Sequence, residues 1–100
     1  MIDGLTINLG GTDYIVPPLN LNGLEKYLKL MDRINETKDD PLAQINITAE
    51  AALIALRRNY PDLTIEDIKE MLDTESSIRL FGVVAEVSGL KKKIVLEPNP

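Results

Sequence analysis

The sequence contains no cysteine and no histidine among its 100 residues. Together these absences remove the thiol nucleophile, the commonest general base and the commonest metal ligands of proteins. They also exclude a disulfide framework, which is consistent with a reducing compartment. Catalysis would depend on carboxylates alone, so we expect neither enzyme activity nor a metal or other cofactor.

Long apolar runs and an excess of positive charge are missing as well. No run approaches the about 18 apolar residues of a membrane-spanning helix, and Met1–Gly4 lacks the pattern of a signal peptide. The net charge of -5 opposes nucleic-acid binding, which requires clustered Lys and Arg to displace counterions. We therefore expect a soluble cytoplasmic protein with no membrane partner and no nucleic-acid partner.

The residues that are present indicate one globular domain that begins with a β-hairpin. The apolar fraction of 44% and the charged fraction of 27% are ordinary for a folded domain. Residues 5–9 alternate apolar with polar, Gly10–Gly11 permits a tight turn, and residues 14–16 are strand formers. Pro17–Pro18 ends the pairing because neither residue has an amide proton to donate. The pattern predicts a hairpin within residues 1–18.

Two amphipathic helices should follow the hairpin. Asn20 is placed to cap the first helix, whose apolar positions recur at helical spacing at Leu21, Leu24, Leu28, Met31 and Ile34. The second helix has two alternative starts. It begins either at Pro41 with Asp40 as cap, or at Thr48, since the β-branched residues between them weaken a helix.

Two further helices complete the predicted domain. The third is short and has a reciprocal cap formed by Thr64 and Asp67. The fourth begins after Asp73 and ends at Gly89, with an apolar face made of Ile78, Leu80, Phe81, Val84 and Val87. The predicted fold class is mainly α (α+β), a single helical domain over residues 1–90. Residues 91–100 form either an added strand or a flexible tail.

Most of the charged clusters are explained by solvation or capping. Asp39–Asp40 lies in a polar stretch at residues 35–40, the best candidate for a mobile loop. Glu66–Asp67 lies in the first turn of a helix, where carboxylates interact favourably with the unpaired amides. Lys91–Lys93 could attract an anionic partner, although a solvated tail explains a short charge run more simply.

The end of the second helix and the last helix carry the candidates for partner contact. Arg57 and Arg58 suit the helix C-terminus. One can pair with Asp62 or Glu66 and leave the other to meet a partner, since Arg is enriched at interfaces. Tyr60 is expected to bury its ring against the first and third helices. The apolar stripes serve either as core or as a groove for a client helix; they are Leu53 with Leu56, and Leu80 with Val84 and Val87.

A hairpin ending in Val16–Leu19 is followed by a leucine-rich helix and by the block Leu56–Thr64 with an acidic helix after it. In this arrangement the chain resembles the tail assembly chaperones of long-tailed bacteriophages and prophages. The resemblance spans nearly the whole chain. Its most specific parts are Arg57–Thr64 and the close of the last helix at Val87–Leu90, whereas the hairpin and first helix are generic.

The resemblance implies a small, mostly helical, non-enzymatic protein made in the cytoplasm of the bacterial host. Such chaperones coat the long tape measure protein, keep it soluble and help to recruit tail tube subunits. Weak contacts between copies would suit repeated binding along a filamentous client. Many members also have a longer form made by a frameshift near the end of the gene. This chain would then be the short form, and the Lys91–Lys93 codons a candidate slippage site.

Three other functions compete with this one. A phage tail terminator or head-tail connector would also be small and acidic, but it would form a stable ring without a client. A small regulator could use the turn at Tyr60–Thr64 within a helix-turn-helix, yet the helix Glu66–Glu70 is acidic where a recognition helix needs donors for base edges. An enzyme would need a site of carboxylates with no evident orienting partner.

Overall fold

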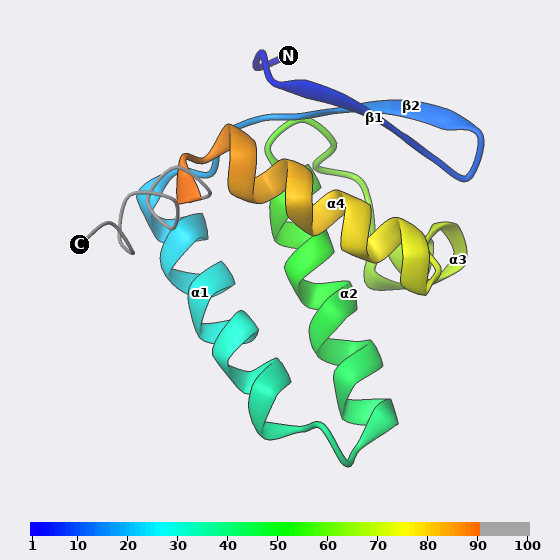
Figure 1. Ribbon diagram of the computed structural model, residues 1–100. Coiled ribbons are helices and arrows are strands. Elements are labelled where there is room, and N and C mark those ends of the chain that lie inside the picture. The colour runs from blue at the N-terminus through cyan, green and yellow to red at the C-terminus, as the bar shows by residue number, and fades with distance from the viewer. Residues whose placement is uncertain (91–100) are drawn as a thin grey trace.

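The computed structural model describes residues 1–90 of the chain, in which a hairpin precedes four helices (Figure 1). The elements are β1 (Leu5–Leu9), β2 (Thr12–Val16), α1 (Leu21–Glu36), α2 (Pro41–Arg57), α3 (Ile65–Met71) and α4 (Thr74–Val87). The predicted α+β class is confirmed, while the prediction for residues 91–100 lies outside the described residues. None of the helices within residues 1–90 has the length and apolar content to cross a membrane.

The hairpin lies at the end of the molecule opposite the α1–α2 loop (Figure 1). Its strands pair antiparallel with Ile7 opposite Tyr14. The turn uses Gly10 at φ 60° and Gly11 at φ 87°, a backbone region that glycine enters without steric cost. Ile7, Leu9 and Val16 are buried, so one face of the hairpin packs on the helices.

Helix α1 begins where predicted but turns a different face to the core. The Asn20 side chain accepts a hydrogen bond from the Gly23 amide at 2.8 Å. The buried residues of α1 are Tyr27 and Leu30, whereas the predicted stripe included Leu21, which is 84% exposed, and Leu28, which is 44% exposed. That stripe was therefore wrong at two positions. Because α1 packs mainly on α2, it buries only a narrow face centred on Tyr27.

Helix α2 is the centre of the fold and starts at Pro41. The Asp40 carboxylate accepts a hydrogen bond from the Ala43 amide at 3.1 Å, so the alternative start at Thr48 is wrong. The helix is surrounded by α1, α3, α4 and β2. Its buried residues are mostly small, which lets the neighbours approach closely; they are Ile47, Ala49, Ala51, Ala52, Leu53, Ala55 and Leu56.

Helices α3 and α4 both start with reciprocal caps. The Thr64 amide donates to the Asp67 carboxylate at 3.0 Å, and the Asp67 amide donates to the Thr64 hydroxyl at 3.2 Å, as predicted. Asp73 and Ser76 do the same for α4, and these hydrogen bonds from Ser76 lower the pKa of Asp73. The predicted face of α4 included Ile78, which is 67% exposed. The adjacent buried position is taken by Ser77, whose hydroxyl donates to the Asp73 carbonyl at 2.7 Å.

Candidate functional site

The apolar candidates on α4 belong mainly to the core of this chain. Leu80 and Val84 are both 0% exposed, and Val87 is half buried against the same cluster. A side chain without exposed surface cannot contact a partner while the domain keeps this packing. The open alternative between core and groove is thus resolved as core for Leu80 and Val84. Leu56 is also 0% exposed, whereas Leu53 reaches the surface with 8% of its area.

The two adjacent arginines at the end of α2 have different surroundings. Arg58 donates through Nη1 to the Pro18 carbonyl at 2.7 Å, which fastens the end of α2 to the segment after β2. Within residues 1–90 the ion pair is Arg79 with Glu75, so neither arginine forms the predicted salt bridge with Asp62 or Glu66. The side chain of Arg57 instead lines a groove on the surface of α2.

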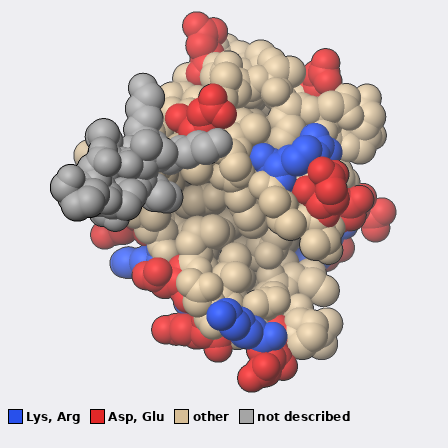
Figure 2. All heavy atoms as spheres, viewed as in Figure 1, with Lys and Arg blue, Asp and Glu red and all other residues tan. Residues whose placement is uncertain are grey.

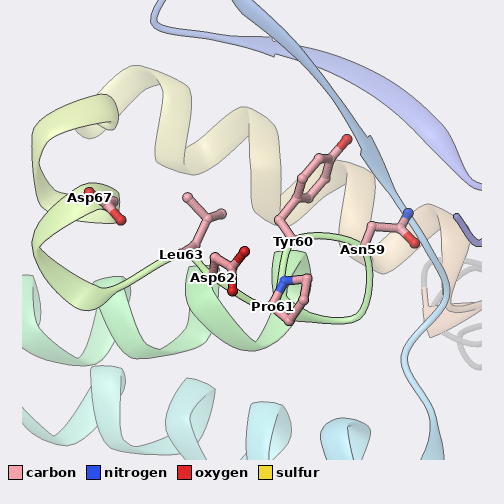
Figure 3. A pocket seen from close by; sticks show the side chains of 6 residues that line it. All are labelled: Asn59, Tyr60, Pro61, Asp62, Leu63 and Asp67. Carbon is pink, nitrogen blue, oxygen red and sulfur yellow. The ribbon is translucent and has the colours of Figure 1, made fainter.

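Tyr60 packs on the hairpin. Its hydroxyl accepts a hydrogen bond from the Ile15 amide at 2.8 Å. Its ring meets the Tyr14 ring edge-on, with 5.1 Å between the centroids. The ring is packed against the core cluster, and its aromatic partner is Tyr14 of β2, a contact that the sequence did not predict. Figure 3 shows the Tyr60 hydroxyl pointing toward the hairpin. This satisfies an amide on the edge of β2 that would otherwise lack a partner in the sheet.

Asn59 is a structural residue that the sequence analysis missed. Its side chain accepts from the Ile2 amide at 2.7 Å and donates to the carbonyls of Ile2 and Ile15 at 2.8 and 3.1 Å. One amide group thus joins the N-terminal segment and the edge of β2 to the end of α2. A single asparagine after a helix carries no signal of such partners, because all of them are distant in sequence. The arginine, asparagine and tyrosine at positions 58–60 together form a tether to the hairpin.

A shallow hollow of about 410 Å³ lies beside this tether (Figure 3). Its polar groups are largely used within the chain: the Asp67 carboxylate caps α3, and the Tyr60 hydroxyl bonds to Ile15. Within residues 1–90 no three acidic side chains come together as a metal site would need. The residues that line the hollow are Asn59, Tyr60, Pro61, Asp62, Leu63 and Asp67.

A larger groove of about 590 Å³ runs between α1 and α2 and reaches the start of α3. Its floor is aliphatic, formed by Leu30, Leu53, Ile54 and Ile65. Leu30 and Leu53 are buried, with 7% and 8% of their surface exposed, while Ile54 and Ile65 are half buried. An open trough with an aliphatic floor is the shape that accepts an apolar stripe of another helix. We refer to it as the α1–α2 groove.

The rim of the α1–α2 groove is positively charged. Lys26, Lys29 and Arg33 line it from α1, and Arg57 lines it from α2. Among residues 1–90, the one acidic side chain in the lining is Glu50. The described lining thus has four basic residues and one acidic residue, whereas the sequence as a whole has 11 basic and 16 acidic residues. The face of the molecule in Figure 2 shows more Asp and Glu than Lys and Arg, and these charged residues are scattered over it.

The sequence pattern indicates one of the rim residues but not the others. Arg57 was a predicted partner contact, but Lys26, Lys29 and Arg33 looked like the solvated side of an amphipathic helix. Only the packing of α1 on α2 places them beside Leu53 and Ile54. Comparison with protein families, curated proteins and solved structures gave no match to this chain. The geometry and the residue pattern therefore carry the functional argument.

Proposed function

We propose that this protein is a tail assembly chaperone of a long-tailed bacteriophage or prophage. It binds the tape measure protein, keeps it soluble in the cytoplasm of the bacterial host and helps to recruit tail tube subunits. It performs no chemical reaction. The residue pattern of Arg57–Thr64 supports this proposal by its resemblance to that family, and the α1–α2 groove is the observation that carries it.

The groove suits a client that is a long helix. Such a client presents an apolar stripe at every turn, and the stripe must be covered to prevent aggregation. The aliphatic floor provides that cover, and the rim charges fix the direction and position of the bound helix. Because the groove is open at the surface, a helix can enter and leave without unfolding the chaperone. That reversibility is required of a chaperone that does not stay in the finished tail.

A ring-forming tail component is the second candidate. Large aliphatic side chains outside the groove are strongly exposed, among them Leu21 at 84%, Leu42 at 74% and Ile78 at 67%. Side chains of this kind are covered when copies of a protein associate. Weak association between copies would also suit a chaperone that coats a filament. The two functions differ in whether a closed ring forms in the absence of client.

The test is co-expression of the tagged chain with the tape measure protein of the same genome. We expect the client to stay in the soluble fraction and to copurify with the chain. Ile65→Gln, which places an amide on the groove floor, should reduce copurification. The matched control Ile78→Gln alters an exposed isoleucine outside the lining and should leave it unchanged. An insoluble client together with elution of the chain as a closed ring would favour the structural component instead.

A further inference from the structure

We propose that the occupant of the α1–α2 groove is an acidic amphipathic helix of the partner protein. This inference rests on the proposed function, because the helix belongs to the client, and it adds the charge that the client must carry. The helix would place its apolar stripe on the floor of the groove. Its carboxylates would flank that stripe and meet the cations of the rim.

The spacing of the cations fits a helix lying along α1. Lys26, Lys29 and Arg33 stand at positions i, i+3 and i+7, so they follow one side of the helix. They span about 10 Å at a rise of about 1.5 Å per residue. A bound helix would present carboxylates at the same intervals. Arg57 stands on α2 across the floor from this row, so both sides of the trough carry positive charge.

The rest of the surface explains why the charge of the client matters. The chain has a net charge of -5, so an acidic helix is repelled by most of the molecule and attracted at the groove. A basic helix would be attracted to many acidic places and repelled at the groove rim. Specificity of this kind combines one attractive site with repulsion elsewhere. The arrangement therefore selects an acidic helix and directs it to one place.

The floor of the groove favours a peptide over a nucleic acid. Four cations alone could also hold phosphates. Proteins that bind single-stranded nucleic acid stack its bases on aromatic side chains, but the lining residues of this groove include no aromatic. The four aliphatic residues instead match the leucine or isoleucine stripe of a helix. We therefore assign the rim charges to carboxylates of a protein.

Glu50 provides a test of whether the bound helix is acidic or basic. It is the one carboxylate of the lining and is exposed on α2. It should repel a carboxylate on a bound helix, so Glu50→Gln should tighten the binding of an acidic helix by about twofold to fivefold. For a basic helix the same substitution should weaken binding. A groove that is indifferent to charge would show no change in either case.

The experiment compares three synthetic helical peptides of about four turns by fluorescence anisotropy with the full chain. All three share one leucine stripe, and their polar faces carry glutamate, glutamine or lysine. We expect affinity to decrease in that order. Raising the ionic strength should weaken the binding of the glutamate peptide, since salt screens exposed charges. The order of the three affinities shows which charge the groove prefers, and the measurement does not require the natural client.

Charge reversal on the rim locates the binding site. Lys29→Glu with Arg33→Glu should weaken the glutamate peptide by about tenfold or more, because two attractive contacts become repulsive. The matched control Lys38→Glu with Lys69→Glu makes the same change in net charge outside the lining and should stay within about twofold. Circular dichroism confirms that both variants keep the fold, which is expected because all four side chains are exposed.

Three results would overturn the inference. Equal affinity for the glutamate and glutamine peptides would show that the groove does not distinguish an acidic helix from an uncharged one. Equal weakening by the rim variant and its control would show that only the total charge matters. Tighter binding of a single-stranded oligonucleotide than of the glutamate peptide would assign the rim to phosphates. In each case, solubilisation of the tape measure protein would still support the chaperone function, whereas peptide binding without solubilisation would refute that function alone.

Discussion

The tether at residues 58–60 and the α1–α2 groove use similar side chains in opposite ways. At the tether, Arg58, Asn59 and Tyr60 direct their polar atoms to backbone groups of the N-terminal segment, of β2 and of the segment after β2. At the groove, Lys26, Lys29 and Arg57 stand on the rim, and no ion pair within residues 1–90 involves them. The adjacent residues Arg57 and Arg58 therefore differ: Arg58 is part of the tether, and Arg57 lines the groove.

The tether and the groove show that the role of a polar side chain depends on whether its polar atoms already have hydrogen-bond partners in the folded chain. A group whose hydrogen bond is already made within the chain has less left for a ligand, and its loss appears as lower stability. A group at the edge of an aliphatic trough, with no side-chain hydrogen bond or ion pair within residues 1–90, keeps its donors for a ligand. The structure therefore divides the sequence candidates: Arg58 and Tyr60 hydrogen-bond within the chain, and Arg57 lines the α1–α2 groove.

Replacing Asn59 should have the largest effect on the tether. Asn59→Ala removes three hydrogen bonds, so we expect the free energy of unfolding to fall by about 3 kcal/mol. Urea denaturation followed by circular dichroism measures this loss. Asn46→Ala changes an exposed asparagine of α2 and should cost less than about 0.5 kcal/mol. A loss below about 1 kcal/mol for Asn59→Ala would show that these hydrogen bonds contribute little.

Tyr27, which α1 buries with its ring edge-on to Phe81, should make stability depend on alkaline pH. Burial raises its pKa from 10.0 to about 12, so the folded state keeps the proton that the unfolded state releases. The contribution is complete below pH 10 and is lost as the pH rises from 10 to about 12. It amounts to about 2 kcal/mol. The difference between wild type and Tyr27→Phe across this range isolates the effect, and parallel pH curves would contradict it.

Tyr60→Phe should have an intermediate effect on the tether. The ring contact with Tyr14 is kept, but the Ile15 amide loses its acceptor. We expect a loss of about 1.5 kcal/mol in the free energy of unfolding. Faster hydrogen exchange at the Ile15 amide would locate the change. If Tyr60→Phe denatured at the same urea concentration as wild type, water would be an adequate replacement for the hydroxyl.

Replacing either arginine with alanine should have the smallest effect on stability. The two replacements should differ clearly, because one should lower stability and the other should weaken peptide binding. Arg58→Ala removes the bond to the Pro18 carbonyl and should cost about 1 kcal/mol. Arg57→Ala should cost less than about 0.5 kcal/mol but should weaken the glutamate peptide by about threefold. Thermal melts and anisotropy on the same two proteins test both statements. The opposite result, with Arg58→Ala weakening binding more, would reverse their roles.

Local signals in the sequence predicted the elements well. The turn at Gly10–Gly11, the caps at Asn20 and Thr64, and the start of the fourth helix after Asp73 depend on neighbours within a few residues, and the structure confirms each. The buried faces were harder to predict. Helical spacing defines a stripe, but the choice between Leu28 and the adjacent Tyr27 depends on how α1 rests on α2. That contact is between two helices, so the spacing within α1 alone does not reveal it.

The candidate site was predictable only in part for the same reason. Arg57 was identified because arginine at a helix end is a common interface residue. Lys26, Lys29 and Arg33 repeat the polar side of any surface helix, and only a neighbouring aliphatic floor gives them a function. Leu80 and Val84 met the pattern for a groove equally well, yet α4 turns them inward against the core.

The hydrogen bonds of Asn59 also set the order in which the chain can fold during translation. They join residues up to 57 positions apart, and the Leu19 amide bonds to Ser88 across 69 positions. The helices α1 and α2, by contrast, are consecutive and are joined by a short turn. Contacts between nearby residues form sooner than distant ones. The α1–α2 pair should therefore assemble while the ribosome is still extending the chain, and the hairpin should dock only after the end of α2 has emerged.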